Sequence, residues 1–338
     1  MWGPITVTER VWALEGSGYR RPLSERIGVR HRCCSRSLRR VLVDFGSDQS
    51  FAKAVDKVGE HYGFEINASA VRKATLECAR EVAEQVRQET GGEYRTLPEG
   101  KGPTIIAEAV GSFVATVQAA PRKGPRPREY QEIRLAAAQA QGNAQAVYAA
   151  SFESVEDLGK RWGHIAKSAG RKIDSAIHGL GDGAEWIARQ VEEVFGLQGS
   201  FLCDLHHVKD YLLEAAPTCE PGQPARWVRT QKERLKRGAK EKVLAELKAH
   251  RETDSPAGEE APVRAAYRYL DRRRDQLDYA GALARDLPIG SGLIESGHKH
   301  VLQARLKLPG CAWLKETASD MAQLRVFRTN GRWAQLWN

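Results

Sequence analysis

Near the amino end of the chain, apolar residues recur at helical spacing. They do so between Ser35 and Phe45 and again from Ser50 to Tyr62, where Gly63 then suits a left-handed helix cap. A third stretch begins at Ser69 as a candidate cap and continues the steps of three and four as far as Val86. We predict three helices, the last two joined by a short turn that contains glycine, as in a helix-turn-helix.

The polar face of the third predicted helix bears on whether this region binds DNA. A plain helical hairpin with a solvated face fits the pattern as well as a DNA-binding motif does. The basic residues that would face DNA are Arg72, Lys73 and Arg80.

The periodicity changes after a linker rich in glycine and proline at residues 90–103. Residues 104–118 are rich in branched side chains and are interrupted by Gly111, which predicts two strands joined closely around that glycine. Residues 130–138 predict a third strand.

Helices and strands alternate in the next part of the chain. We predict a helix from Ser154 to about Ala169, a strand over 173–180, a helix, a strand over 200–204 and another helix. Three antiparallel strands followed by parallel strands alternating with helices is the order of the ribonuclease-H-like fold, a mixed sheet of the α/β class. This is an analogy of fold and does not by itself give a function.

Residues 217–285 interrupt this scheme with a predicted helical insertion. Prolines between residues 217 and 224 break the chain, and helices are predicted over 226–251 and 262–283. Within 226–242, eight cations face two glutamates, which favours phosphate contact over a merely solvated face. The cations singled out are Arg229, Lys232, Arg234, Lys236 and Arg237.

These patterns predict five parts of the chain. They are an irregular basic segment at 1–34, a helix-turn-helix region at 35–90, a first part of the catalytic core at 91–216, the helical insertion at 217–285, and a helical part of the core at 286–338.

Composition narrows the class of protein. The formal net charge is +9, which makes a polyanion such as DNA a plausible partner. No window approaches the length of apolar chain that spans a bilayer, and the first residues lack the pattern of an export signal, so we expect a cytoplasmic, nucleoid-associated protein and no membrane partner. Six cysteines are too sparse for a disulfide framework. No phosphate-binding G-x-x-x-x-G-K-[ST] motif occurs, so no nucleotide cofactor is expected.

Carboxylates that follow strands of such a sheet converge on one edge, where two metal ions can be held. The candidates are Asp182 and Glu295, with Asp204 as a competitor of Asp182. Each also has a structural interpretation. Asp182 lies between glycines and could cap a helix, and Glu295 could stabilise the first turn of one.

Four stretches together resemble insertion-sequence transposases of the ISKra type, which are DDE transposases distantly similar to mutator-type enzymes. The stretches are Asp44–Ala52 with Ala68–Lys73, Gly181–Ile187, Asp204–His207 with Tyr211–Leu212, and Ile289–Glu295 with Arg305, Lys307, Gly310 and Trp313. The resemblance covers about residues 35–338.

The resemblance implies roles by position. Asp182 and Glu295 would be the second and third acidic ligands of two Mg²⁺ or Mn²⁺ ions. Asp204 and His207 would support the site or contact DNA, and Arg305 and Lys307 would meet phosphates near the cut. The implied partners are double-stranded DNA, as element ends and target, and a second copy of the chain on paired ends.

One position departs from the family pattern. Where the first strand should read acidic-x-Asp-Gly, this chain reads Glu108-Ala-Val-Gly111, so Val110 takes the place of the first catalytic aspartate. Valine cannot bind a metal, and Glu108 lies about 7 Å along the strand, too far to replace it. We therefore expect weak or absent cleavage. The alternatives are a DNA-binding regulator that has lost cleavage, or an unrelated ribonuclease-H-like nuclease.

Overall fold

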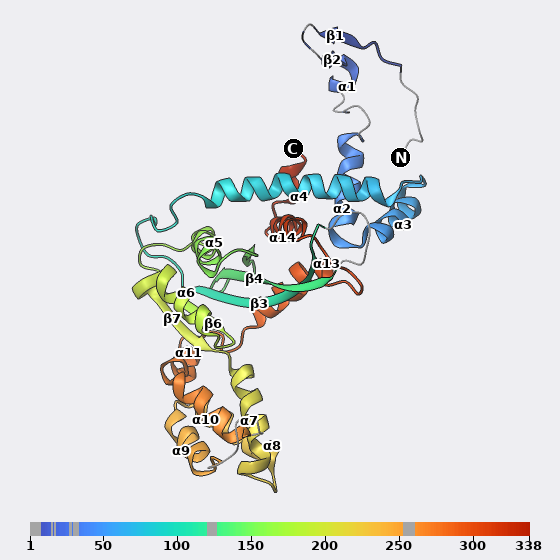
Figure 1. Cartoon of the computed structure of the whole chain (residues 1–338). Coiled ribbons are helices and arrows are strands. Elements are labelled where there is room, and N and C mark those ends of the chain that lie inside the picture. The colour runs from blue at the N-terminus through green and yellow to red at the C-terminus, as the bar shows by residue number, and fades with distance from the viewer. Residues whose placement is uncertain are drawn as a thin grey trace. The chain divides into compact units, whose positions relative to one another are not determined.

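The computed structural model describes residues 8–14, 16, 18–26, 29, 34–119, 127–252 and 261–338. The chain divides into two compact units (Figure 1). The first unit comprises residues 1–89, 114–131 and 300–338, and the second unit comprises residues 90–113 and 132–299. Part of the predicted irregular segment, and Cys33, lie outside the described residues. The described part of that segment contains the antiparallel strands β1 (Trp12–Leu14) and β2 (Gly18–Arg20) and the short helix α1 (Pro22–Arg26).

The three predicted amino-terminal helices are present as α2 (Arg36–Asp48), α3 (Phe51–Tyr62) and α4 (Ala68–Thr90). The hydroxyls of Ser35 and Ser50 accept N–H groups in the first turns of α2 and α3. Gly63 ends α3 with φ +70°. Ser69 is not the cap of α4. The Asn67 side chain accepts the N–H of Ala70 at 2.8 Å instead.

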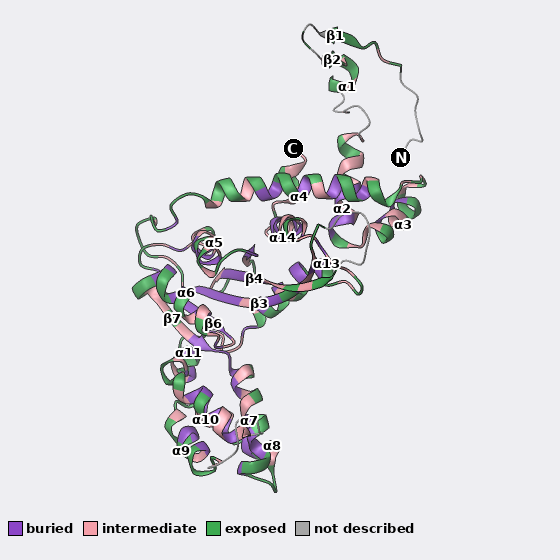
Figure 2. Cartoon of the chain, in the orientation of Figure 1, coloured by how far each residue is buried: buried purple, intermediate pink, exposed green. Residues whose placement is uncertain are grey.

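Helix α4 has a buried stripe and an exposed stripe along its length (Figure 2). The remaining elements near the carboxyl end are a π-helix (His298–Gln303), α13 (Ala304–Leu306), α14 (Lys315–Thr329) and a 3-10 turn (Trp333–Leu336).

A five-stranded mixed sheet has the order β5-β4-β3-β6-β7. Its strands are β3 (Ile105–Val117), β4 (Arg128–Ala140), β5 (Val147–Ser151), β6 (Ile177–Gly181) and β7 (Gly199–Cys203). Strand β5 is antiparallel to β4, while β6 is parallel to β3 and β7 is parallel to β6. Two hydrogen bonds, Gln141 N–H to Thr104 O and Thr116 Oγ1 to Glu129 O, show that β4 runs antiparallel to β3. The predicted sequence of antiparallel and then parallel strands is therefore confirmed.

The number of antiparallel strands was predicted correctly, but two of the individual strands were not. Gly111 does not separate two strands, because β3 continues through it. A Cβ atom at Gly111 would lie 2.2 Å from Glu132 Oε1, so a side chain there would displace the end of the Glu132 side chain. The third antiparallel strand is β5, which the sequence analysis did not predict.

Helices α5 (Val155–Ser168) and α6 (Glu185–Phe195) form a core with the sheet in the second unit. Ala107 and Ala109 of β3 contribute to this core together with Trp162 and Ile187. Because side chains alternate along a strand, Glu108 and Val110 belong to the other face of β3.

The second unit also contains a helical cluster, defined here as α7 (Leu205–Cys219), α8 (Pro224–Lys236), α9 (Lys240–Ala249), α10 (Pro262–Arg272) and α11 (Tyr279–Ala284). Figure 1 shows α7, α8, α9 and α10 gathered together. The short 3-10 turns Gly196–Gln198 and Arg274–Gln276 and the helix α12 (Gly292–Gly297) complete the unit.

Two details of the predicted insertion were wrong. Pro217 does not break the chain, because α7 continues through it to Cys219. The helix predicted over 226–251 is two helices, separated at Gly238, which adopts φ +75°. Within the described residues, no helix has both the length and the apolar character that crossing a bilayer requires.

Candidate functional site

Acidic residues follow the two neighbouring parallel strands β6 and β7. Gly181, the last residue of β6, is level with Cys203, the last residue of β7, so Asp182 and Asp204 follow their strands side by side. Each carboxylate accepts the N–H of the residue two positions later, Ala184 at 2.9 Å and His206 at 2.5 Å. Asp204 is therefore the N-cap of α7. Asp182 stabilises the turn before α6 and does not cap that helix, whose N-cap is Ala184, so the capping interpretation of Asp182 is wrong.

The register of β3 and β6 relates the position of Val110 to that of Asp182. In the parallel ladder of β3 and β6, Glu108 is opposite Leu180. The same register continued by two residues brings Val110 level with Asp182, on the face of the sheet opposite the α5 and α6 core. Val110 is half-buried. An aspartate at position 110 would therefore extend from the strand next to the one that Asp182 follows.

The turn that holds Asp182 is fixed by α10. Tyr269 Oη donates to the backbone oxygen of Asp182 at 2.7 Å. The Arg273 guanidinium donates to the backbone oxygen of Gly183 from Nε at 2.8 Å and from Nη2 at 2.6 Å. Gly183 has φ +80°, and a Cβ atom there would lie 2.5 Å from Tyr269 Oη. Only glycine allows the turn to be held so closely.

Asp204 is much more enclosed than Asp182, with 2% of its surface exposed. Its second carboxylate oxygen accepts both the N–H of Ser291, at 2.8 Å, and the Ser291 hydroxyl. The N–H of Leu205 donates to Ile289 O at 3.0 Å. Asp204 therefore joins the start of α7 to the segment that precedes α12, and neither of its oxygens is free.

Glu108 is the functional candidate that the sequence analysis undervalued. It is 1% exposed, and its Oε2 accepts the N–H of Ile294 in the first turn of α12 at 2.7 Å. Burial, with a smaller contribution from the negative charges of Asp204 and Glu295, raises the pKa of Glu108 to about 8. A single acid in the apolar run from Ile105 to Val110 was the signal that could have identified it.

Glu295 itself is exposed on α12. Its charge acts on Glu108, so the electrostatics connect Glu295 with Glu108 and Asp204. On the same face of β3 as Glu108, the Ser112 hydroxyl forms a 2.6 Å hydrogen bond with His298 Nε2. His207 lies half-buried on α7.

The donor set was compared with what a two-ion site requires. In the part of the chain that the structure describes, no group of three or more His, Cys, Asp or Glu side chains is arranged to hold a metal ion. Asp204 has both oxygens engaged, Glu108 accepts a backbone N–H, and Val110 offers no ligand. The described residues therefore do not fit a pair of bridged ions.

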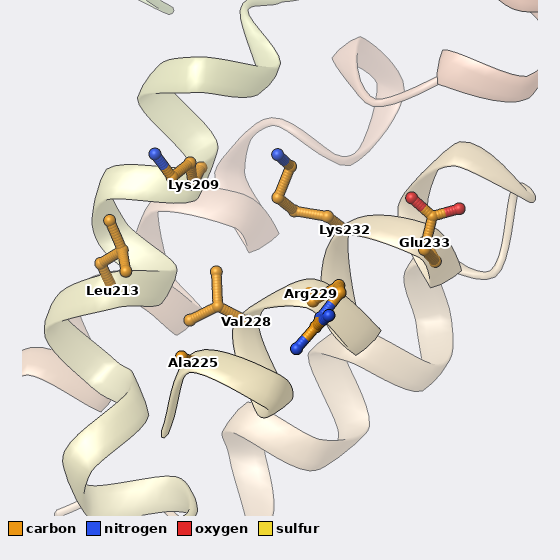
Figure 3. Close-up of a pocket in the computed structure, with 7 residues that line it drawn as sticks. All are labelled: Lys209, Leu213, Ala225, Val228, Arg229, Lys232 and Glu233. Atoms are coloured by element: carbon orange, nitrogen blue, oxygen red, sulfur yellow. The ribbon is translucent and has the colours of Figure 1, made fainter. Parts of the chain in front are cut away.

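A second candidate site is a basic cavity of about 290 Å³ between α7 and α8 (Figure 3). Lys209, Arg229 and Lys232 line it, together with Leu213, Ala225, Val228 and Glu233. The amino groups of Lys209 and Lys232 lie on the same side of the cavity, although they come from different helices. Lys209 was not predicted, because it lies on α7, before the basic run begins.

The other predicted cations of α8 differ in whether a carboxylate pairs with them. Arg234 pairs with Glu246 of α9, and Lys236 pairs with Glu233 at 3.0 Å. Glu246 also accepts the indole N–H of Trp227 and the amide of Gln231. For Arg229, Lys232 and Arg237, no ion pair is found among the described residues. The excess of cations counted along the sequence is thus partly neutralised in space.

The basic residues predicted in the first unit also differ in their exposure to solvent. Arg72, Lys73, Arg80 and Lys307 are exposed, and Lys73 lies 3.9 Å from Glu77. Partial burial lowers the pKa of Lys307. Arg305 is only 1% exposed, because its guanidinium lies between the rings of Phe51 and Trp313 and its Nε donates to Gly46 O. In this structure Arg305 is part of the protein interior.

Comparison with known proteins gives a family but no described activity. The model of an uncharacterised protein family, UPF0236, matches residues 19–336. Two proteins of that family from Caldanaerobacter subterraneus subsp. tengcongensis are 31% and 30% identical over 156 residues, which is 46% of this chain and 31% of each relative. The name of the second carries eleven locus designations. The matched stretch is about a third of the relatives' length, while the family model extends over nearly the whole chain, and this chain belongs to the UPF0236 family.

Proposed function

We propose that this chain is by descent a DDE-type transposase of the ISKra type, with a ribonuclease-H-like core, that binds DNA and cleaves it poorly. The observation that carries the proposal is the position of Val110. It is level with Asp182 on the neighbouring parallel strand of a sheet whose order is β5-β4-β3-β6-β7. In such a site the first and second carboxylates come from these two strands.

The names of the relatives give independent support. One related protein bears eleven locus designations within one strain. A gene that copies itself around a genome produces such a record, whereas a housekeeping enzyme rarely does. Copying of this kind is the activity of an insertion sequence.

The proposal assigns limited metal chemistry to this chain. By resemblance, Asp182 and Glu295 occupy the positions of two of the three acidic ligands of Mg²⁺ or Mn²⁺, although the described residues do not fit a pair of bridged ions. The carboxylate that would bridge two ions is missing at Val110. Asp204 cannot replace it, because Ser291 and His206 already occupy both of its oxygens.

DNA binding is proposed for the basic cavity of α7 and α8 and for the exposed face of α4. Lys209, Arg229 and Lys232 present positive charge around a concave surface, which suits the phosphate backbone. A homodimer on paired element ends is the assembly that we propose, since two ends must be joined to one target.

Restoring the missing carboxylate tests the proposal. We expect Val110→Asp to raise Mn²⁺-dependent nicking of element-end DNA by about 100-fold, because a carboxylate able to ligate the metal is regained, while DNA affinity changes little. Val110→Asn is the matched control of similar size without the charge. Equal and negligible cleavage by two well-folded variants would contradict the proposed site.

A salt titration tests the basic cavity. Lys232→Gln should lower the slope of log affinity against log salt by about 1, because one phosphate contact is lost. Lys57→Gln, an exposed lysine of α3 paired with Glu60, is the control and should leave the slope unchanged. Equal slopes for both variants would show that the cavity does not contact the DNA backbone.

A DNA-binding regulator without cleavage is the second candidate. The engagement of Asp204 favours it, because this carboxylate already accepts three hydrogen bonds and is not spare to replace the one missing at Val110. Cleavage by the unaltered chain in Mn²⁺ would exclude this candidate, whereas DNA binding without cleavage would favour it.

A further inference from the structure

A cavity in the first unit combines two arginines with the start of a helix. Its volume is about 290 Å³, and Arg72 of α4, Arg305 of α13, and Leu314 and Thr317 at the start of α14 line it. No aspartate or glutamate lines the cavity among the described residues. The walls therefore offer positive charge and hydrogen-bond donors to whatever enters.

Arg305 is a buried cation whose hydrogen bonding is incomplete. Its Nε donates to Gly46 O at 3.0 Å, but Nη2 is buried and has no acceptor. Within the described residues, no carboxylate forms an ion pair with Arg305. Asp48, whose charge acts on it, is already paired with Arg325 and Arg328. A buried charge with an unsatisfied donor is costly, and an anion would relieve the cost.

The aromatic rings beside Arg305 fix where its charge lies. The guanidinium carbon is 4.6 Å from the ring centre of Phe51 and 4.8 Å from that of Trp313. Both rings line the cavity. They hold the guanidinium in place and leave its charge without water on those sides. Arg305 thus provides a fixed positive charge against the cavity wall.

Helix α14 adds donors from a different direction. It has fifteen residues, and its N-cap is Leu314, which makes no side-chain hydrogen bond. The N–H groups of its first turn therefore lack a side-chain acceptor, and the helix dipole favours a negative charge there. The start of α3, by contrast, is capped by Ser50.

We propose that this cavity binds the phosphate group of a nucleotide, with Arg72, Arg305 and the first turn of α14 as its donors. Two guanidinium groups and a helix start suit a phosphate better than a singly charged carboxylate. The cavity is larger than a phosphate alone requires, so a sugar can enter with it. The nucleotide is either free or at a phosphorylated end of a DNA strand. Inorganic phosphate binding needs no part of the transposase proposal.

The experiment compares two cations of the first unit in the full chain. Arg72 of α4 lines the cavity, whereas Lys57 of α3 is paired with Glu60 and does not line it. Binding of inorganic phosphate and of deoxyadenosine monophosphate is measured by calorimetry for the unaltered chain, Arg72→Gln and Lys57→Gln. We expect Arg72→Gln to weaken the binding of both about tenfold, as loss of a charge-assisted hydrogen bond would, and Lys57→Gln to change it less than twofold.

A second variant and two duplexes complete the test. Arg305→Lys keeps the buried positive charge while losing the fork of donors, and it should also weaken phosphate binding. Duplexes with and without a 5′-phosphate distinguish the sources. A preference for the phosphorylated duplex that Arg72→Gln removes would assign the cavity to a strand end, and equal binding of both duplexes with retained nucleotide binding would assign it to a free nucleotide.

Two results would overturn the proposal. One is the absence of phosphate and nucleotide binding by the unaltered chain at millimolar concentration. The other is an equal effect of Arg72→Gln and Lys57→Gln. Because neither measurement involves cleavage or element ends, failure here is distinguishable from failure of the proposed function.

Discussion

The turns after β6 and β7 share a sequence pattern and differ in what surrounds them. Each strand is followed directly by an aspartate that accepts an N–H two residues later. Asp182 is half-buried, and one of its oxygens makes this contact, whereas Asp204 is 2% exposed and Ser291 occupies its other oxygen. The same local motif thus gives one carboxylate that can still bind a ligand and one that holds the fold together.

The difference arises far away in the chain. Ser291 is separated from Asp204 by 87 positions, and Tyr269 is separated from Asp182 by the same number. Ser291 donates hydrogen bonds to the carboxylate of Asp204, whereas Tyr269 donates one to the backbone oxygen of Asp182. A pattern read along either strand contains no information on which distant group arrives.

Replacing each aspartate by asparagine should separate the two turns most strongly. Asp204→Asn should lower the free energy of unfolding by about 3 kcal/mol. The buried carboxylate accepts three hydrogen bonds, and in asparagine an NH₂ group, which can only donate, replaces one of its two acceptor oxygens. Asp182→Asn should lower it by less than about 1 kcal/mol, since its side chain is partly solvated. Urea unfolding of both variants measures this, and equal losses would remove the distinction between the turns.

The pH dependence of stability sharpens the comparison through Glu108, whose pKa the charge of Asp204 helps to raise. The folded-state pKa is about 8 against an ordinary value of 4.5, so the folded chain holds this proton more tightly than the unfolded chain. Its stabilising contribution is complete below the ordinary value and is lost as the pH rises through about 8.

Glu108→Gln removes this titration. Between pH 6 and pH 8, the unaltered chain should lose about 2–3 kcal/mol of stability relative to the variant. Urea unfolding at several pH values measures the difference. Glu316→Gln, an exposed acid in the first turn of α14, is the control and should follow the unaltered chain. Parallel curves for the unaltered chain and Glu108→Gln would show that the buried carboxyl is ionised at neutral pH.

Two tyrosines of the helical cluster provide the finest comparison. Tyr269 donates to Asp182 O at 2.7 Å, and Tyr279 donates to Cys203 O at 2.9 Å. Each tyrosine-to-phenylalanine change should cost about 1 kcal/mol, with the larger loss for Tyr279→Phe because Tyr279 is 0% exposed and water cannot replace it. Thermal unfolding checks the order, and a larger loss for Tyr269→Phe would contradict it.

The comparison also shows what a sequence can predict here. Helix starts at Ser35, Ser50 and Ser154 were predictable, because each depends on a cap three residues from its donor. The place of Val110 beside Asp182 followed from strand order and the family pattern. Strand β5 was missed, because its run Val147–Ser151 is only five residues long and includes two alanines, which are depleted in strands.

Charge was predicted less well than secondary structure. The basic run of α8 was evident, but Glu246 of α9, twelve positions further along the chain, pairs with Arg234 and neutralises its charge. Arg305 was predicted to meet phosphates at the surface, yet Phe51 and Trp313 enclose it. Ion pairs and stacking depend on tertiary neighbours, and the linear sequence does not show which neighbours those are.

The contact of Arg273 and Tyr269 with the Asp182 turn has a consequence for recombining this protein with relatives. Gly183 leaves no room for a side chain, and its oxygen is satisfied only by an arginine from α10. A chimera that took the helices α8 to α11 from another family member would need a compatible pair at these positions, or else Gly183 would be left with an unpaired carbonyl. The helical cluster and this turn should therefore be exchanged as one module.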